Sequence, residues 1–339
     1  SRIRVLERLA LTGDQSARTG LEAVHAEVAQ EDAAYIEILQ RWKKELLRLP
    51  NMPDISVPTG DDTQEMVEMS RSEQVPTPAE NQTFDEYLKT IVPHVADRGE
   101  NTFLQYEGST HALYHQLEHV IYQWMYSRGY TPSDLQPGVT RDTCVASGIS
   151  PDECAQLTAD QVFGIVGSHA APYVLSAMQG VALTELDALK HFVVYVPLHR
   201  SEKDRTMSLK CGLGIVCPPR HDISVTHHES LRNLHEELLK ALGIPWITSV
   251  VTARKAHPST VKTYCITIPL WKEAPSFVHV SYYHDFQARR AGITHTDEAG
   301  RRRFAHTMSS SGFRLDALLA ALLLVHGDRA EEVLRTIHL

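Results

Sequence analysis

The first fifty residues carry apolar side chains at a heptad spacing. Five of them recur every seven residues and two more fill the second heptad position: Leu21, Val28, Tyr35, Trp42 and Leu49, with Leu39 and Leu46. His25 and Asp32 interrupt that second position. Such a seam is typical of a helix in a hairpin or a short coiled coil. The spacing also fits an amphipathic helix lying on a core, but the periodicity favours a protruding hairpin.

A shorter helix is predicted to pair with this seam. Leu6, Leu9 and Leu11 supply its apolar positions, and Gly13 and Gly20 flank the turn expected between the two helices. The N-terminal part of the chain is therefore predicted to be a helical hairpin arm.

Pro50 ends the long helix, because proline cannot continue the hydrogen-bond pattern. Residues 50–62 are rich in Pro, Gly and Asp, and residues 63–82 stay polar and are interrupted by prolines. This composition is typical of a linker. We therefore expect an arm over residues 1–50, a linker over 51–82 and a globular domain over 83–339.

Helices and strands alternate in the globular part. Helices are predicted over 110–128 and 229–242, ended by Gly129 and Gly243, and a final helix rich in Leu and Ala is predicted to begin at Gly312. Three strands are predicted: 192–197, 263–270 and 276–283. Strands that cluster late and are bracketed by helices indicate an α+β fold with an antiparallel sheet rather than repeated βαβ units.

Composition removes several classes of protein. The 339 residues have a net charge of -9, which excludes nucleic-acid binding through bulk positive charge alone. The five cysteines include no CxxC pair, so neither a disulfide framework nor a Cys-rich zinc site is indicated. The longest apolar run, residues 317–325, is too short to span a membrane. The first residues show no signal or transit peptide, which a mature chain would have lost.

Three histidines share one predicted helix face at a spacing that can hold a metal ion. His111, His115 and His119 are four residues apart, but no acidic residue completes an HExxH pattern, and one helix places three ligands poorly. We therefore predict a face in the core or at an interface, and no metal site. His227 and His228 are predicted to be a loop pair.

Familiar nucleotide and hydrolase motifs are absent. The sequence has no GxxxxGK[ST] loop and no GxSxG elbow, and Gly212-Leu213-Gly214 lacks the third glycine of a dinucleotide fingerprint. Arg289-Arg290 and Arg301-Arg302-Arg303 are predicted to be solvated loop charges, with a phosphate-facing role as the alternative. The residues alone thus indicate an α+β protein without a legible active site.

Several segments, however, resemble the motifs of one family and occur in its order. They are residues 49–58 (LPNMPDISVP), 103–131, 199–202 (HRSE), 242–245 (LGIP), 262–264 (KTY), 285–290 (DFQARR) and 304–312 (FAHTMSSSG). They resemble the seryl-tRNA synthetases, which are class II aminoacyl-tRNA synthetases, and DFQARR resembles a segment specific to that family. The resemblance implies an antiparallel sheet flanked by helices, and an arm over residues 1–50 that is a shortened tRNA-binding arm.

The positions that hold ATP and serine in the family differ in this chain. Arg200, Glu202 and Ser311 match the family and are interpreted as relics. The departures are Ala170 for a serine-binding Glu, Ile215 for a motif 2 Arg, Ser276 for a Glu, Ser309 for an Asn, and Ala317 for the Arg that contacts the ATP phosphates. An apolar side chain cannot replace a guanidinium. The resemblance therefore implies a protein without catalytic residues or a cofactor.

This pattern is similar to a catalytically degenerate, insect mitochondrial branch of the family. That similarity implies a mitochondrial matrix protein that pairs with the active mitochondrial seryl-tRNA synthetase, or with itself, and contacts tRNA or other mitochondrial RNA in support of translation. An active ATP-dependent ligase with an altered amino-acid or acid substrate is the alternative.

The resemblance also places two surfaces. The expected dimer interface lies on the motif 1 helix: His111, Tyr114, Leu117, Tyr122 and Trp124. The expected RNA contacts lie near the end of the arm: Arg41, Lys43, Lys44 and Arg48. The arm holds eight basic and eight acidic residues, so only a local positive cluster can attract phosphate. A solvated helix end is the alternative for that cluster.

Overall fold

The computed structural model contains two compact units, Ser1–Leu49 and Pro50–Leu339. It describes these residues: 11–13, 15–60, 65–74, 82–91, 94–98, 101–132, 140–150, 175, 178–184, 189–195, 206–207, 210–272 and 276–337. Within the described ranges, no helix is both long enough and apolar enough to cross a membrane.

The first unit is dominated by one helix of 33 residues, α2 (Gln15–Leu47). Gly13 has a φ of 91° and forms a turn before it, but Gly20 lies inside α2, so the turn predicted to extend to Gly20 is wrong. The flanking alanines, leucines and glutamates tolerate a single glycine within a helix at a cost of about 1 kcal/mol. Leu11 is 87% exposed, while Leu6 and Leu9 lie outside the described residues.

The predicted apolar seam of α2 faces solvent in the structure. Within α2, Val28, Tyr35, Leu39, Trp42 and Leu46 are exposed, and Leu21 is half-buried. The heptad prediction of a helix is therefore confirmed, and the described residues show no second helix on the seam.

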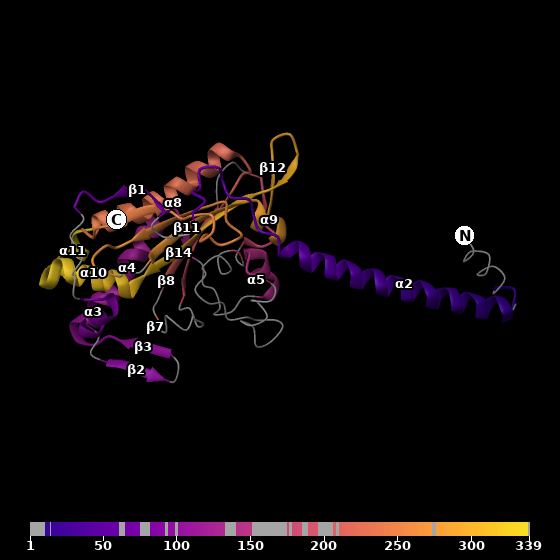
Figure 1. Cartoon of the computed structure of the whole chain (residues 1–339), viewed down its shortest axis with the longest axis horizontal. Helices are drawn as coiled ribbons and strands as arrows, with labels where there is room; N and C mark the ends of the chain where they lie inside the picture. Colours follow the sequence, from indigo (N-terminus) through magenta and orange to yellow (C-terminus); the bar gives the residue numbers. More distant parts are fainter. Residues whose placement is uncertain are drawn as a thin grey trace. The chain divides into compact units, whose positions relative to one another are not determined.

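The second unit is built on an eight-stranded sheet (Figure 1). In spatial order its strands are β1 (Val67–Arg71), β9 (Ile247–Val250), β10 (Lys262–Thr267), β11 (Ser276–His284), β14 (His306–Arg314), β8 (Lys210–Cys217), β6 (Leu189–Tyr195) and β4 (Thr131–Pro132). All neighbouring pairs are antiparallel except β4 and β6. The predicted antiparallel α+β architecture is confirmed.

Two smaller sheets complete the strands. One has the order β13 (Arg302–Phe304), β12 (Thr294–Thr296), β5 (Ala182–Leu183), and the other β2 (His94–Arg98), β3 (Asn101–Gln105), β7 (Thr206–Met207).

Helices cover both faces of the large sheet. The main hydrophobic core joins one face to α3 (Phe84–Ile91), α4 (Gly108–Ser127), α8 (His221–Ala241), α10 (Leu315–His326) and α11 (Ala330–Thr336). A short 3-10 helix, η2 (Gly327–Arg329), joins the last two. On the other face, a second apolar cluster includes α5 (Arg141–Ser147) and α9 (Phe286–Ala291). Successive residues of a strand point to opposite faces of the sheet, so one strand can contribute side chains to both clusters.

The segment predicted as a linker is partly structured. The backbone N–H of Asn51 donates to the carbonyl of Pro258, and that of Asp54 donates to Val261. Strand β1 then pairs with β9 as an edge of the sheet. A polar, proline-rich composition signals a lack of helix but does not exclude an edge strand, which needs few apolar residues. The prediction of a plain linker over 51–82 is therefore corrected.

The end of β14 also differs from the prediction. Gly312 was expected to begin the last helix, but β14 continues through it and α10 begins at Leu315. The register between Ser310 and Phe313 shifts relative to β8, which marks a bulge. Gly312 has a φ of 89°, and a Cβ on it would lie 2.5 Å from the carbonyl of Cys211. Glycine is needed here for a bulge, not for a helix start.

Candidate functional site

The sheet face beside α5 and α9 carries Ser309, one of the positions at which the chain departs from the family. Its described side chains form a buried network of neutral groups. The Ser309 Oγ and the Tyr283 hydroxyl lie 2.8 Å apart, and the Thr307 hydroxyl donates to Gln287 Oε1 at 2.9 Å. The Gln287 amide in turn donates to the Ser147 carbonyl at 2.9 Å. These groups satisfy one another, so their hydrogen-bonding capacity is largely used within the fold.

A small cavity among the described residues lies beside this network. A cavity of about 10 Å³ lies between strands β8 and β14 and helix α9, with these lining residues: Leu175, Met178, Ile215, Val216, Gln287, Thr307, Met308 and Ser309. Ligand pockets have volumes of about 300–1,000 Å³, and one water needs roughly 10–15 Å³. This cavity among the described residues has room for about one water molecule.

Two of the altered positions lie inside the main core. Ile215 is 0% exposed and Ala317 is 1% exposed, and both belong to the cluster that packs α4, α8 and α10 on the sheet. A guanidinium at either position would have to be desolvated in this cluster. The apolar residues at these two positions therefore contribute to folding.

Of the other family positions, Ser311 makes a structural contact, and the rest have side chains outside the described part of the chain. Ser311 Oγ accepts the backbone N–H of His279 at 2.9 Å, between β14 and β11. Ser276 begins β11, but its side chain lies outside the described part. Arg200, Glu202 and Ala170 also lie outside the described residues, so the relic and serine-contact assignments for them stay predictions.

Titratable groups near this face are held neutral by burial. Desolvation, together with the positive charge of Lys210, lowers the pKa of His279 to about 4. Burial also raises the pKa of the Tyr283 hydroxyl. At neutral pH neither side chain is charged, so neither can neutralise a phosphate.

A buried ion pair near the start of α10 was not predicted. The Arg314 guanidinium lies 2.6 Å from the Asp316 carboxylate, and the two side chains are 11% and 0% exposed. The guanidinium also lies 5.2 Å from the centre of the Phe84 ring. The only sequence signal was an Arg and an Asp two residues apart at the start of an apolar helix. This arginine is already paired with a carboxylate of the chain.

The predicted interface residues on α4 divide into two groups. Leu117 is 0% exposed and Trp124 is 4% exposed, so both belong to the chain's own core and cannot be interface anchors. The helix has apolar residues on more than one side, and spacing alone did not show which side faces the sheet. His111 and Tyr122 are exposed, and the half-buried Tyr114 stacks on a neighbouring tyrosine.

The predicted RNA contacts lie at the C-terminal end of α2 and just after it. Arg41, Lys43 and Lys44 are exposed, and the Arg48 guanidinium lies 2.8 Å from the Glu45 carboxylate. An exposed ion pair of this kind contributes only about 0–1 kcal/mol, so it does not prevent Arg48 from meeting a phosphate.

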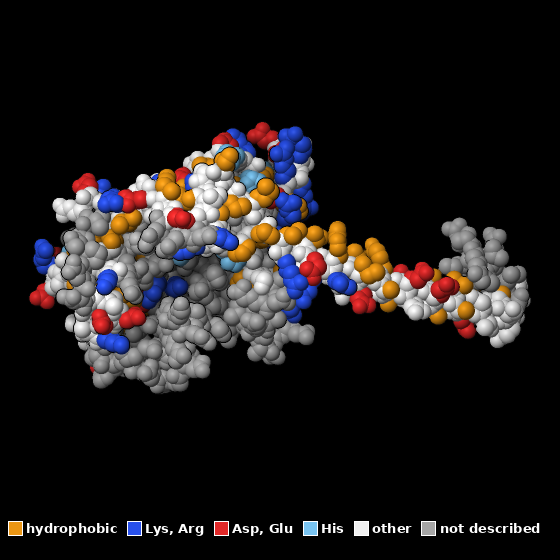
Figure 2. Space-filling view, viewed as in Figure 1, with side chains coloured by type: hydrophobic (Ala, Val, Ile, Leu, Met, Phe, Trp, Pro, Cys, Tyr) orange, Lys and Arg blue, Asp and Glu red, His pale blue; other side chains and the backbone are white. Residues whose placement is uncertain are grey.

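The other arginine clusters are partly neutralised. Figure 2 shows basic side chains gathered over the β12 region. Arg301 pairs with Asp297 at 2.9 Å, Arg289 pairs with Asp285 at 2.6 Å, and Arg302 donates to a threonine hydroxyl. Arg289, Arg301, Arg302 and Arg303 are exposed, as predicted for solvated charges. The prediction is wrong for Arg290, which is half-buried over the Phe286 ring, and both Arg289 and Arg290 lie on helix α9 and not in a loop.

Two weaker sequence candidates are also located. His228 lies in α8. Its ring is neutral at neutral pH, because burial lowers its pKa to about 4. Its Nε2 lies 3.2 Å from the Val280 carbonyl, so the predicted loop pair is wrong. Gly212 and Gly214 lie within strand β8, not in a nucleotide-binding turn.

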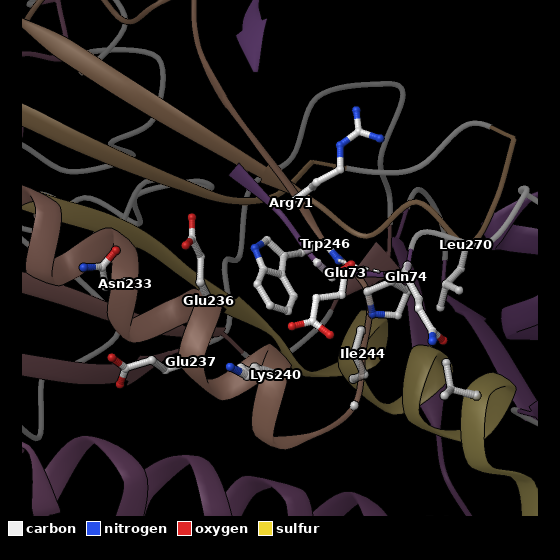
Figure 3. Close-up of a pocket in the computed structure, with 14 residues that line it drawn as sticks. Arg71, Glu73, Gln74, Asn233, Glu236, Glu237, Lys240, Ile244, Trp246 and Leu270 are labelled. Atoms are coloured by element: carbon white, nitrogen blue, oxygen red, sulfur yellow. Dashed lines mark hydrogen bonds between the residues drawn. The ribbon is translucent and has the colours of Figure 1, made fainter. Parts of the chain in front are cut away.

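A larger pocket of about 750 Å³ lies elsewhere, where the end of β1 meets α8 and the following turn (Figure 3). In Figure 3 the Trp246 indole lies between the side chains of Glu236 and Glu73. Glu236 already accepts hydrogen bonds from Ser70 and Thr248, at 2.6 and 2.7 Å. No residue of the family motifs for ATP or serine lines this pocket.

Comparison with known proteins agrees with the fold. No family model matches the chain. The structure is similar to seryl-tRNA synthetase from Pyrococcus horikoshii complexed with ATP, with a TM-score of 0.76, 17% identity and coverage of 97% of this chain and 83% of that one. It is also similar to cytoplasmic serine–tRNA ligase from Naegleria fowleri in complex with AMP, with a TM-score of 0.74, 12% identity and coverage of 99% and 86%.

The relatives found by sequence are also serine–tRNA ligases. Serine–tRNA ligase of Deinococcus radiodurans is 26% identical over 313 residues, which cover 84% of this chain and 71% of the relative. That of Caldicellulosiruptor bescii is 28% identical over 311 residues, with coverage of 83% and 71%. The fold is that of the class II aminoacyl-tRNA synthetases. At the sequence level, the chain is similar to serine–tRNA ligases.

Proposed function

We propose that this chain is a non-catalytic relative of seryl-tRNA synthetase that acts in mitochondria as a dimerisation partner and an RNA-associated factor. The observation that carries the proposal is the state of the ATP and serine positions. Ile215 and Ala317 are core residues, and Ser309 belongs to a network of neutral side chains.

Amino-acid activation depends on positioning and on stabilising charge at phosphorus. Removing one charged contact of this kind costs roughly 3–4 kcal/mol of transition-state stabilisation. Two lost arginines and a lost carboxylate would together remove any useful rate. This supports a protein that keeps the scaffold for binding other macromolecules.

Serine-dependent exchange of pyrophosphate with ATP tests the loss of activation directly. We expect no exchange above background with serine or with other small amino acids. The Deinococcus radiodurans serine–tRNA ligase, assayed alongside, is the positive control. Robust exchange with any of these substrates would contradict the proposal and favour a ligase with an altered substrate.

The proposed partner is the active mitochondrial seryl-tRNA synthetase, and the proposed surface is the exposed side of α4. His111 and Tyr122 lie there, and Tyr122 is 38% exposed. Co-expression of the two chains followed by native mass measurement should give a heterodimer. A Tyr122→Asp change should weaken it, and Tyr126→Asp, at a 60% exposed position one turn on, tests the extent of the surface. Only monomers or homodimers in the mixture would refute the partnership.

The proposed mitochondrial location follows from the same family resemblance. Imaging of the tagged full-length precursor in cells should show it with a matrix marker. A cytosolic distribution would refute this part of the proposal and leave the loss of activation unaffected.

A further inference from the structure

Two imidazole rings meet on the exposed side of α4. His111 and His115 lie one turn apart, with ring centres 4.5 Å apart, and their Nε2 atoms face each other at 3.2 Å. Both residues are exposed, so water and ions can reach the pair.

The distance between the two nitrogens is the distance that a shared metal ion requires. Two imidazole nitrogens that each lie about 2.0–2.1 Å from a tetrahedral ion are ~3.3 Å apart. The observed 3.2 Å matches this geometry without movement of the helix backbone. Residues four apart on a helix lie on the same face, which explains how the sequence brings the rings together.

A carboxylate prepares one of the ligands. Glu118 Oε2 lies 3.1 Å from His115 Nδ1 and, as a carboxylate oxygen, accepts a hydrogen bond from the Nδ1–H group. This interaction fixes the proton on Nδ1 and leaves the lone pair of Nε2 directed at His111. Metal-binding histidines commonly have such a carboxylate on the second ring nitrogen, where it orients the ring and strengthens the ligand.

We propose that His111 and His115 form a binding site for a divalent transition-metal ion of the zinc class. The two Nε2 atoms are the protein ligands, and water completes the coordination. When the ion binds, the single ring proton of neutral His111 moves from Nε2 to Nδ1 by exchange with water, so both Nε2 lone pairs are free to bind the ion. Nitrogen ligands select zinc, nickel or copper over magnesium or calcium.

The site needs two residues and no others from the chain. Within the described residues, no group of three or more His, Cys, Asp or Glu side chains is arranged for a metal ion. In the described part of the chain, His119, on the next turn, makes no hydrogen bond or ring contact with the pair. The sequence predicted no metal site on this helix face, and the present proposal departs from that prediction for His111 and His115 alone. The proposal goes beyond the proposed function and does not depend on it.

Calorimetric titration of zinc chloride into the chelator-treated, desalted full-length chain tests the site. We expect one zinc ion per chain that is lost in His111→Ala and in His115→Ala, with affinity reduced by at least tenfold in each. Glu118→Gln should weaken binding by about 10-fold to 100-fold, because it removes the orienting carboxylate. His119→Ala is the matched control and should bind as the original chain does.

The 19 histidines of the chain make the comparison between variants essential. Zinc binding that is the same in His111→Ala, or no stoichiometric zinc in the original chain, would overturn the proposal. An unchanged affinity in Glu118→Gln would overturn the role given to the carboxylate. Circular dichroism of each variant confirms that α4 stays folded. Because His111 also lies on the surface proposed for the partner, the titration is carried out without the partner chain, with binding constants and not oligomer mass as the readout.

Discussion

Ile215 and Ala317 show what can be read from single residues and what cannot. Matching the sequence to the family motifs position by position identified both residues as departures, because such a match needs only the order of the residues. Their burial at 0% and 1% could not be read that way, because it depends on which side of the sheet Ile215 faces and on how α10 packs Ala317 into the core. A bulge beside Gly312 shifts the parity of β14, and sequence spacing does not reveal it.

Restoring an arginine at Ala317 should damage the fold instead of restoring nucleotide binding. The side chain would place an unpaired charge in the main core, so we expect Ala317→Arg to lower the free energy of unfolding by at least about 3 kcal/mol. Urea denaturation measures this. Leu324→Arg, on the same helix at a 38% exposed position, is the control and should change stability by under about 0.5 kcal/mol. Ala317→Arg with unchanged stability and new ATP binding would contradict this account.

Buried histidines make stability depend on pH. His235 is 0% exposed, and neither of its ring nitrogens has a hydrogen-bond partner in the described part of the chain. Burial lowers its pKa to about 3. The unfolded chain takes up this proton below about pH 6.5, whereas the folded chain does not. Stability is therefore lost as the pH falls from about 6.5 towards 3.

Replacing His235 with leucine should reduce this pH dependence. One proton of difference corresponds to about 1.4 kcal/mol per pH unit, and His235→Leu should remove about that slope between pH 6 and 4. At pH 7 the variant should be about 1 kcal/mol more stable, because it no longer buries unpaired nitrogens. Denaturation at a series of pH values measures both effects, and His119→Leu, at an exposed position, should change neither. The same slope in His235→Leu would refute the assignment.

Among the elements, helices were more predictable than the edges of sheets. The helix predicted over 110–128 is α4, Gly108–Ser127, and Gly129 follows it with a φ of 78°. Helix ends follow from local chemistry, namely apolar periodicity and a terminal glycine. Strand β1 escaped prediction because its place depends on pairing with β9, about 180 residues later, and not on its own composition.

The bulge in β14 gives a test at the element scale. Gly312→Ala would place a Cβ 2.5 Å from the Cys211 carbonyl, in a left-handed backbone conformation. Gly292→Ala shares the positive φ, 71°, but has no atom within 4 Å of the new Cβ. We expect the control to lose about 1 kcal/mol and Gly312→Ala to lose at least about 2 kcal/mol more. Thermal and urea unfolding compare them, and equal losses would show that the close approach is unimportant.

For the molecule as a whole, the late strands predicted an antiparallel sheet but not its order. Strand order is set by contacts between distant segments, for example β8 against β14, whose partners lie about 100 residues apart. The candidate site was located by resemblance to family motifs, because its own residues, such as Ser309 and Thr307, are ordinary buried hydroxyls.

RNA binding depends on how charge is distributed over the whole molecule. The net negative charge lies in the globular unit, and the basic cluster of Arg41, Lys43, Lys44 and Arg48 lies on the arm. We expect full-length protein to bind RNA with strong salt dependence, and the combined change of Arg41, Lys43, Lys44 and Arg48 to alanine to weaken binding and reduce the salt slope. Removal of residues 1–49, one compact unit, should have at least the same effect. Filter binding at several salt concentrations measures this. Undiminished affinity in both variants would refute binding through the arm.

The exposed seam of α2 also supplies an optical reporter. The chain has four tryptophans, of which Trp124 and Trp271 are 4% and 1% exposed and Trp246 is half-buried, while Trp42 is 63% exposed. Acrylamide quenches accessible indoles first, so the quenchable fraction of the emission comes mainly from Trp42. Protection of that fraction when RNA or a protein is added would locate the contact on the arm without any label, and Trp42→Phe would abolish the signal.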